Sequence, residues 1–175
     1  MRVVGGEFRS RRLKSIPGLD TRPTPDRLRE TLFDILGSRV EGAAFLDAYA
    51  GTGAVGIEAL SRGAARAIFI ERSKNAAKVI RENLASLGIE HRALLVTASA
   101  ASSLPHHRAD FVFLDPPYNR ENEYAAALAL LSVEPPPLVI VQHSPRFTPA
   151  ESFGSLRKTR TIKQGDNALS FYAPL

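Results

Sequence analysis

A glycine-rich loop at residues 51–56 constrains the fold more than any other feature of the sequence. It reads GTGAVG and stands between an apolar run, AAFLDAYA, and a segment of helical character, IEALSRG. Gly51, Gly53 and Gly56 thus match G-x-G-x-x-G between a strand and a helix, where glycines allow a tight turn and close approach of a ligand. Glu71 ends the next apolar run, 20 residues beyond Gly51, and is placed to accept hydrogen bonds from ribose hydroxyls. The loop therefore predicts a site for a nucleoside-containing cofactor.

Apolar runs that alternate with helical segments surround this loop. Helices between buried strands build βαβ units, in which the strands pair in parallel. The last two runs flank the turn at 164–167 and predict an antiparallel pair. We therefore expect an α/β, Rossmann-like fold with a mostly parallel seven-stranded sheet and an antiparallel C-terminal hairpin. The expected strands are 43–50, 67–71, 93–98, 110–115, 138–143, 155–163 and 168–174, and the expected helices between them include 57–63, 74–87 and 121–132.

The first 40 residues form an extension ahead of this sheet. Gly5-Gly6 is a two-residue turn signal that predicts a β-hairpin over 2–13. Thr24 as N-cap and Pro25 at the first helical position predict a helix directly after them. A chain of 175 residues has the length of one domain. We divide that single domain into a basic hairpin-and-helix extension, 1–40, and a cofactor-binding and catalytic core, 41–175.

Positive charge is concentrated at the two ends of the chain. Of the 23 basic side chains 18 are Arg, and the formal net charge is +5. Residues 1–29 contain eight basic and three acidic side chains, residues 141–175 contain five and two, and the middle is net negative. Arg carries a planar donor fork that suits phosphate, and a basic end on a neutral body is typical of a nucleic-acid-binding protein. A solvated basic tail would have the same composition.

Composition also excludes several classes of protein. The chain has no cysteine, which rules out a disulfide scaffold, a cysteine zinc site and a thiol nucleophile. No apolar run approaches the roughly 18 residues of a membrane span, and the first residues lack the apolar stretch of a signal peptide. We expect a cytoplasmic protein without a membrane partner. We expect no metal site either, because the four histidines show no ligand spacing with carboxylates: His91, His106, His107 and His143.

Asp47 helps to choose between cofactors. It lies at the end of the strand before the glycine loop and gives the pattern D-x-x-x-G-x-G. A carboxylate there would repel the pyrophosphate of NAD but could attract the ammonium group of a methionyl moiety. Asp47 therefore favours S-adenosylmethionine over NAD, with a helix or loop cap as the alternative role.

A second motif follows the expected strand 110–115. Asp115-Pro116-Pro117-Tyr118 ends an apolar strand with two prolines, which fix the backbone and remove hydrogen-bond donors. The motif thereby holds a carboxylate, a proline carbonyl and an aromatic ring together. Asp115 and the Pro116 carbonyl can each accept one N–H of a planar exocyclic amine, while Tyr118 can stack on the base. The loop therefore predicts chemistry on the amino group of a nucleobase.

With both loops in place, the sequence resembles the amino-methyltransferases, which use S-adenosylmethionine to methylate exocyclic nitrogens of bases. It resembles more closely the RsmD family of 16S ribosomal RNA (guanine-N2)-methyltransferases. The matching segments, in the family's order, are RVVGGEFRSRRL, RPTPDRLRETLFDIL, FLDAYAGTGAVGIEALSRGA, FVFLDPPY and NALSFY. The resemblance implies a class I methyltransferase fold, S-adenosylmethionine as cofactor, and methylation of guanine N2 in 16S ribosomal RNA. The expected partner of the protein is that RNA, within an assembling small subunit. We expect the protein to be a monomer.

The expected site residues fall into three groups. The catalytic group is Asp115, Pro116, Pro117 and Tyr118. The cofactor-binding group is Asp47, Tyr49, Gly51, Thr52, Gly53, Glu71, Arg72, Ser99, Ala100 and Asp115. The RNA-binding group is Arg2, Arg9, Arg11, Arg12, Lys14, Arg22 and Arg27, with helix caps and surface ion pairs as the alternative role for Arg22 and Arg27.

Two positions depart from the family pattern. Ser99 stands where an acidic or amide residue is expected near the adenine, and Gln142 stands where an acidic residue is common, so we assign Gln142 no role. Two other functions remain. One is an amino-methyltransferase that acts on DNA adenine or another RNA. The other is a dinucleotide-dependent oxidoreductase or a non-catalytic binding protein, against which Asp47 and the D-P-P-Y loop argue.

Overall fold

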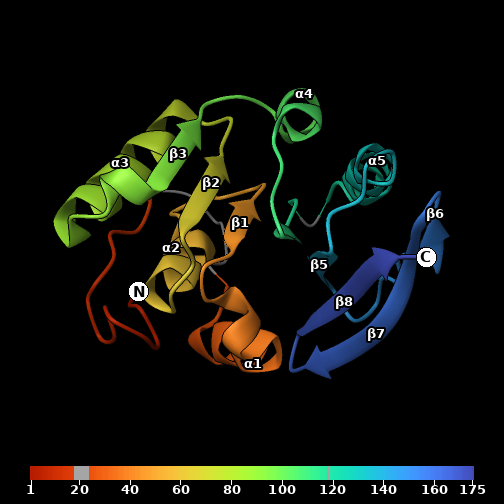
Figure 1. Cartoon of the computed structure of the whole chain (residues 1–175), viewed down its shortest axis with the longest axis horizontal. Helices are drawn as coiled ribbons and strands as arrows, with labels where there is room; N and C mark the ends of the chain where they lie inside the picture. Colours follow the sequence, from red (N-terminus) through yellow and green to blue (C-terminus); the bar gives the residue numbers. More distant parts are fainter. Residues whose placement is uncertain (18–23, 118) are drawn as a thin grey trace.

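Five parallel strands and three antiparallel ones form a single sheet in the order β3-β2-β1-β4-β5-β8-β7-β6 (Figure 1). The computed structural model describes residues 1–17, 24–117 and 119–175. The parallel strands are β1 (Ala44–Asp47), β2 (Arg66–Ile70), β3 (Ala93–Val96), β4 (Phe111–Leu114) and β5 (Leu138–His143). The antiparallel strands are β6 (Ser152–Phe153), β7 (Leu156–Gln164) and β8 (Asn167–Pro174). The expected α/β class and C-terminal hairpin are confirmed, with β6 as an eighth strand that we did not expect.

Helices cover both faces of the sheet because side chains along a strand alternate between the two faces. Phe45, Phe69 and Phe113 form one core with helices α1, α2 and α3, while Leu46, Ile68 and Val112 form the other with α4 and α5. The helices are α1 (Asp26–Leu36), α2 (Ala54–Ser61), α3 (Lys74–Leu87), α4 (Ala100–Ser103) and α5 (Glu121–Leu131). Short 3-10 helices are η1 (Gly37–Val40), η2 (Glu90–Arg92) and η3 (Leu104–His106). None of the described helices is long and apolar enough to cross a membrane.

The third glycine of the loop has a packing role. A Cβ atom at Gly56 would lie 2.4 Å from the Phe69 ring, so only glycine lets α2 approach β2 this closely. This is the helix–strand contact that the last glycine of the motif provides in dinucleotide-binding folds.

The N-terminal hairpin prediction is only partly correct. Residues 2–13 fold back on themselves, but their pairing is a single isolated bridge between Arg2 and Arg12, and no regular strand forms. The reversal is also longer than the two residues Gly5-Gly6. The cause is contact with α2: a Cβ atom at Gly6 would lie 2.0 Å from the Ser61 carbonyl oxygen, so this stretch follows the helix surface rather than a tight turn.

The start of α1 also differs from the prediction. Pro25, not Thr24, is the N-cap, and Asp26 is the first helical residue. Thr24 is buried, and its hydroxyl donates a hydrogen bond to Oε1 of Gln142 at 3.1 Å. Thr24 therefore joins the start of α1 to the end of β5 instead of capping the helix.

A buried ion pair joins α1, α2 and the start of the chain. Arg29 and Glu58 are both fully buried, with Nη1 of Arg29 3.2 Å from Oε1 of Glu58. The same nitrogen donates to the Arg2 carbonyl at 2.9 Å. The two carboxylate oxygens of Glu58 accept hydrogen bonds from the backbone N–H groups of Val4 and Gly5 at 2.9 and 2.8 Å. Residues 1–16, here called the N-terminal arm, are thereby fixed to the helical layer.

Candidate active site

A cleft of about 1050 Å³ opens at the carboxyl ends of β1, β2 and β4. The strand order reverses direction between β1 and β4, and such a switch point is where open α/β sheets bind their ligands. The volume is at the upper end of the roughly 300–1,000 Å³ found for ligand pockets, which leaves room for a cofactor and a second reactant. We call it the carboxyl-edge cleft.

Most of the expected catalytic and cofactor residues line this cleft. From the expected groups they are Asp47, Tyr49, Gly51, Thr52, Glu71, Arg72, Ser99, Ala100, Asp115, Pro116 and Pro117. Gly53 does not line it and instead precedes α2 in a left-handed conformation, with φ of 85°. Tyr118 lies outside the described residues. The sequence thus identified most of a set that the fold brings together from four separate loops.

Glu71 holds the glycine loop in place. Its Oε2 accepts a hydrogen bond from the Gly51 N–H at 2.8 Å, and its Oε1 accepts one from the Ser73 N–H at 2.9 Å. Gly51 has a φ of 58°, which favours glycine. Each carboxylate oxygen can accept a second bond, so Glu71 remains able to receive a ribose hydroxyl.

Replacing Glu71 by alanine should weaken the binding of S-adenosylhomocysteine by about 1.5–3 kcal/mol, the range for hydrogen bonds to a charged group. Isothermal titration calorimetry measures this loss directly. Glu82→Ala is the matched control, because Glu82 pairs with Lys14 at 3.2 Å on the outside of α3 and does not line the cleft. If Glu71→Ala binds S-adenosylhomocysteine as tightly as wild type, Glu71 does not contact the ligand and only holds the backbone of Gly51 and Ser73.

Of the acidic residues that line the cleft, Asp47 and Asp115 have raised pKa values. Burial raises the pKa of Asp47 to about 7, a shift that the hydrogen bond from the Gly56 N–H opposes and the negative charge of Glu71 reinforces. Burial, and then the negative charge of Asp47, raises the pKa of Asp115 to about 8. Two carboxyls with pKa values near neutrality beside one cleft are typical of a functional site. They would be stabilised in their charged forms by a cationic ligand.

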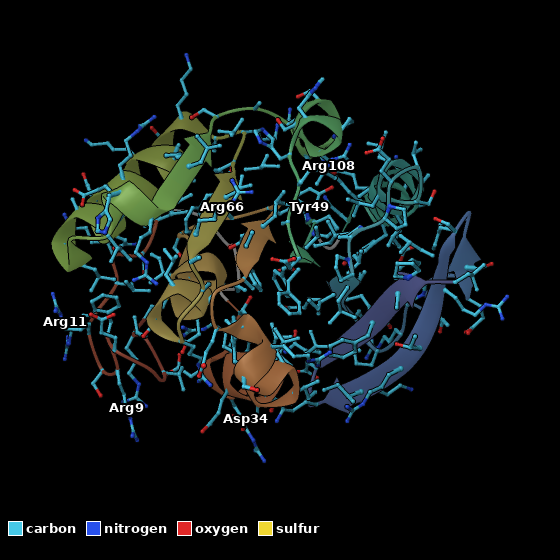
Figure 2. All side chains as sticks on the ribbon, viewed as in Figure 1. Arg9, Arg11, Asp34, Tyr49, Arg66 and Arg108 are labelled. Carbon is cyan, nitrogen blue, oxygen red and sulfur yellow. The ribbon has the colours of Figure 1, made fainter. Side chains whose placement is uncertain are left out.

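Three cleft residues beyond the D-P-P loop were missed by the sequence analysis. Asn119, Arg120 and Glu123 all line the cleft. Nη1 of Arg120 lies 3.2 Å from Oε1 of Glu123. Glu123 also forms a hydrogen bond with Tyr49, and burial together with this carboxylate raises the pKa of the Tyr49 hydroxyl. Tyr49, near the centre of the molecule in Figure 2, is thereby linked to the start of α5 across the cleft.

The N-terminal arm forms another wall that the sequence analysis did not predict. Met1, Ser15 and Ile16 line the cleft. Asn83, buried on α3, accepts a hydrogen bond from the Lys14 N–H at 2.7 Å and donates to the carbonyls of Lys14 at 3.2 Å and Thr52 at 3.0 Å. One amide therefore joins the arm to the glycine loop.

The described residues that were expected to bind RNA lie outside the cleft. Arg2 pairs with Asp26 at 3.1 Å, Lys14 pairs with Glu82, and Nη2 of Arg11 donates to the Ser86 carbonyl at 2.9 Å. Arg9 and Arg11 extend from the periphery of the molecule at the lower left of Figure 2. Arg9, Arg12 and Arg27 are also exposed. Arg22 lies outside the described residues.

The described residues contain no group of three or more His, Asp or Glu side chains placed to hold a metal ion. His143 is buried at the end of β5, where its Nε2 lies 2.7 Å from the Ser170 hydroxyl. Gln142 beside it contacts Thr24 and, at 3.4 Å, the side chain of Asn167. Both residues therefore join β5 to neighbouring segments.

A parallel sheet with one reversed strand beside β5 and a ligand cleft at its switch point is the architecture of the Rossmann-like methyltransferases. The solved structure of yhhF from Escherichia coli matches with a TM-score of 0.85 and 33% sequence identity, over 99% of this chain and 97% of that chain. The profile of the family described as Conserved hypothetical protein 95 matches residues 1–173. The chain belongs to this family, the RsmD family of methyltransferases.

Two relatives support this assignment. Ribosomal RNA small subunit methyltransferase D of Escherichia coli strain K12 is 40% identical over 152 residues, which span 77% of this chain and 74% of the relative. The Bacillus subtilis protein YlbH is 33% identical over 181 residues, with 98% of each chain covered. The predicted family membership is confirmed.

Proposed function

We propose that this protein transfers the methyl group of S-adenosylmethionine to the exocyclic N2 of a guanine in the RNA of the small ribosomal subunit. One observation carries the proposal: Asp115 and Pro116 line the same cleft as the glycine loop and Glu71. Acceptors for an amine are therefore next to the residues suited to a nucleoside cofactor. The name of the Escherichia coli relative supports small-subunit ribosomal RNA as the substrate.

The cleft fits this cofactor. Glu71 is suited to the ribose, the left-handed Gly51 leaves the loop backbone open to the ligand, and Asp47 is a buried carboxyl group that the ammonium group would favour in its charged form. When bound, S-adenosylmethionine supplies an activated methyl group on a positive sulfonium. The sulfonium provides its own activation, so the protein chiefly has to position the two reactants.

Asp115 and the Pro116 carbonyl orient the amine in this proposal. The lone pair of guanine N2 is delocalised into the ring. Accepting both N–H bonds favours a more pyramidal nitrogen, with its lone pair directed at the methyl group. As N2 gains positive charge during transfer, the carboxylate of Asp115 stabilises it electrostatically. The methylated product then loses a proton, for which an arylammonium needs no strong base.

Nucleoside analysis by mass spectrometry tests the proposal. The protein is incubated with S-adenosylmethionine and three substrates in parallel: 16S ribosomal RNA, assembled small subunits and duplex DNA. We expect N2-methylguanosine in at least one of the RNA samples. Methyladenine in the DNA, or a methylated base other than guanine in the RNA, would assign the amine chemistry to a different substrate.

Affinity for the cofactor should depend on pH through the two cleft carboxyls, whose pKa values are about 7 for Asp47 and about 8 for Asp115. The sulfonium favours their charged forms, and S-adenosylhomocysteine lacks that charge. Raising the pH from below 7 to above 8 should therefore strengthen the binding of S-adenosylmethionine relative to S-adenosylhomocysteine. The gain is about tenfold for each unit by which the sulfonium lowers the pKa of a carboxyl.

Calorimetry of both ligands across this pH range checks the prediction, and S-adenosylmethionine should also release more protons than S-adenosylhomocysteine on binding. Asp115→Ala should reduce the difference, since one of the two titrating groups is gone. Identical pH profiles for the two ligands would place the sulfonium away from both carboxyls.

The arginines of the N-terminal arm should bind RNA phosphate without affecting the cofactor. In a plot of the logarithm of RNA affinity against the logarithm of salt concentration, replacing Arg9, Arg11 and Arg12 by alanine should make the negative slope shallower by about 2. Each phosphate contact contributes about 0.7 to the slope for a single strand. RNA binding across a salt series gives the slope, and calorimetry of S-adenosylmethionine serves as the control. If the salt dependence of RNA affinity has the same slope for wild type and variant, these arginines are surface charges that do not contact RNA phosphate.

A further inference from the structure

A second hollow, of about 450 Å³, lies between α1 and β7, away from the carboxyl-edge cleft. We call it the α1–β7 groove. Its lining combines two cations, Arg160 and Lys163, with the partly buried apolar side chains of Ile35 and Ile162. The Thr31 hydroxyl donates to Oε1 of Gln164 at 3.2 Å and joins the helix to the strand beside the groove. The groove is therefore a built feature of the packing of α1 on the sheet.

A β-bulge directs Arg160 to this side of the sheet. The register between β7 and β8 shifts between Lys158 and Arg160, so that Arg160 pairs with Phe171. Phe171 belongs to the core that contains α1, and paired residues share a face of the sheet. Arg160 consequently lies on the face covered by α1. Bulges commonly redirect a side chain in this way beside functional sites. Lys163, three positions further along β7, lies on the opposite face of the strand, yet it also lines the groove.

The positive charge of the groove is not neutralised by the protein. Arg160 and Lys163 are exposed, and neither has an ion pair with any described residue. Asp34 also lines the groove, but its carboxylate lies 3.8 Å from the Arg62 guanidinium. Arg27, one helical turn before Thr31 on α1, is exposed as well. The groove thus presents cations to an anionic ligand.

The groove adjoins the same edge of the sheet as the cleft. His143, the last residue of β5, pairs with Ala168 of β8, and Ala168 pairs with Lys163 of β7. Lys163 is therefore level with the carboxyl ends of the parallel strands. At the same edge, the cleft residue Thr24 contacts Gln142, the neighbour of His143.

The N-terminal arm lies on the other side of the cleft. Apart from the bonds of Arg2 with Asp26 and Arg29 of α1, its contacts are with α2 and α3, which pack against β2 and β3, whereas β7 is near the opposite end of the sheet. Figure 1 shows the arm at the left, β7 at the lower right and α1 between them. Two basic regions therefore flank the cleft from opposite sides.

We propose that the α1–β7 groove binds the sugar–phosphate backbone of the RNA strand on the side of the target base opposite to the N-terminal arm. This inference rests on the proposed function, since it takes the target base to occupy the carboxyl-edge cleft. Arg160 and Lys163 contact successive phosphates, and the apolar floor of Ile35 and Ile162 packs against ribose. A strand held on both sides presents one unstacked base to the cleft, as enzymes that modify bases require.

The test compares two double variants that each remove two exposed positive charges. Arg160→Ala/Lys163→Ala alters the groove. Arg66→Ala/Arg108→Ala is the matched control, because Arg66 begins β2 and Arg108 precedes β4, at the amino edge of the sheet. The probe is an oligouridine strand with one central guanine, and its affinity is measured across a salt series. Thermal melting verifies that both variants are folded.

We expect the groove variant to flatten the log–log salt slope by about 1.4, or about 0.7 for each lost phosphate contact, and the control to leave it unchanged. Combining the groove variant with the Arg9, Arg11 and Arg12 replacements should lower the slope additively. A groove variant whose salt line is parallel to that of wild type would overturn the proposal. So would equal flattening by the control, or a wild type with no measurable affinity for the strand at low salt.

Photocrosslinking locates the strand independently. With 4-thiouridine placed on one side of the guanine, crosslinks should fall in α1 or β7, and with the label on the other side they should fall in the arm. Crosslinks to the arm from both positions would overturn the inference. Guanine methylation by the wild-type protein is measured separately, on ribosomal RNA. If no N2-methylguanosine forms but the salt slopes and crosslinks are as expected, the proposed function is wrong and the inference that the groove binds RNA still holds.

Discussion

Replacing Asp115 by alanine should slow methyl transfer by about 100- to 1,000-fold, the loss seen when one preorganised electrostatic partner of a transition state is removed. Asp115 follows β4 directly and lines the cleft, where burial and the charge of Asp47 raise its pKa to about 8. In the proposed mechanism it contacts the amine, not the methionyl group. Single-turnover transfer at saturating S-adenosylmethionine measures the rate, and calorimetry measures cofactor binding, which should be retained.

Asp110→Ala is the matched control for this experiment. Asp110 precedes β4 at the opposite end and accepts a hydrogen bond from the Ala44 N–H at 2.8 Å, so it lies on the edge away from the cleft. Its replacement should leave turnover intact. If Asp115→Ala instead weakens S-adenosylhomocysteine tenfold or more while the bound complex turns over normally, Asp115 binds the cofactor and a different group orients the amine.

Replacing Arg29 by methionine should lower the free energy of unfolding by about 3–5 kcal/mol, because it removes the fully buried partner of a buried carboxylate. That carboxylate is Glu58, which is fully buried beside Arg29 and holds the backbone of Val4 and Gly5. Arg62 is the other cationic partner of Glu58, at 2.9 Å, but is partly exposed. Urea unfolding measures the loss, and we expect Arg62→Met, the matched control, to be clearly less destabilising.

A double variant separates charge from packing at this pair. Arg29→Met/Glu58→Gln removes both charges, so it should be more stable than Arg29→Met alone, since no buried charge remains unpaired. If the double variant is the less stable of the two, the loss in Arg29→Met comes from the hydrogen bonds of the guanidinium to the Arg2 and Thr24 carbonyls rather than from the charge on Glu58.

The parts of the cleft that could be predicted from the sequence are those with local signals. Gly51 and Glu71 are recognisable because a tight turn and a strand end each have a characteristic sequence, and Asp47 and Asp115 end apolar runs. The carboxyl ends of parallel strands meet at one edge, so four such local signals define one site without any knowledge of side-chain contacts. The cleft lining confirms that these residues are brought together.

The parts that were missed depend on contacts between distant segments. Asn83 lies in a helix of mixed polar and apolar residues, where an amide is expected to be exposed, yet it is buried against Lys14 and Thr52. Arg29 and Glu58 are of residue types that are almost never fully buried unless paired, and 29 positions separate them. The hairpin at 2–13 was overestimated for the same reason, because its path depends on α2.

The attachment of the N-terminal arm has a consequence for how this family can diversify. Glu58, Ser61 and Asn83 are the anchors, and each holds backbone atoms of the arm: the N–H groups of Val4, Gly5, Phe8 and Lys14. The helices thus specify where the arm runs, whichever side chains it carries outward. Substitutions at its outward positions can therefore leave its path intact, so natural variation or protein engineering can alter the charge and shape that the arm presents while the carboxyl-edge cleft is inherited unchanged.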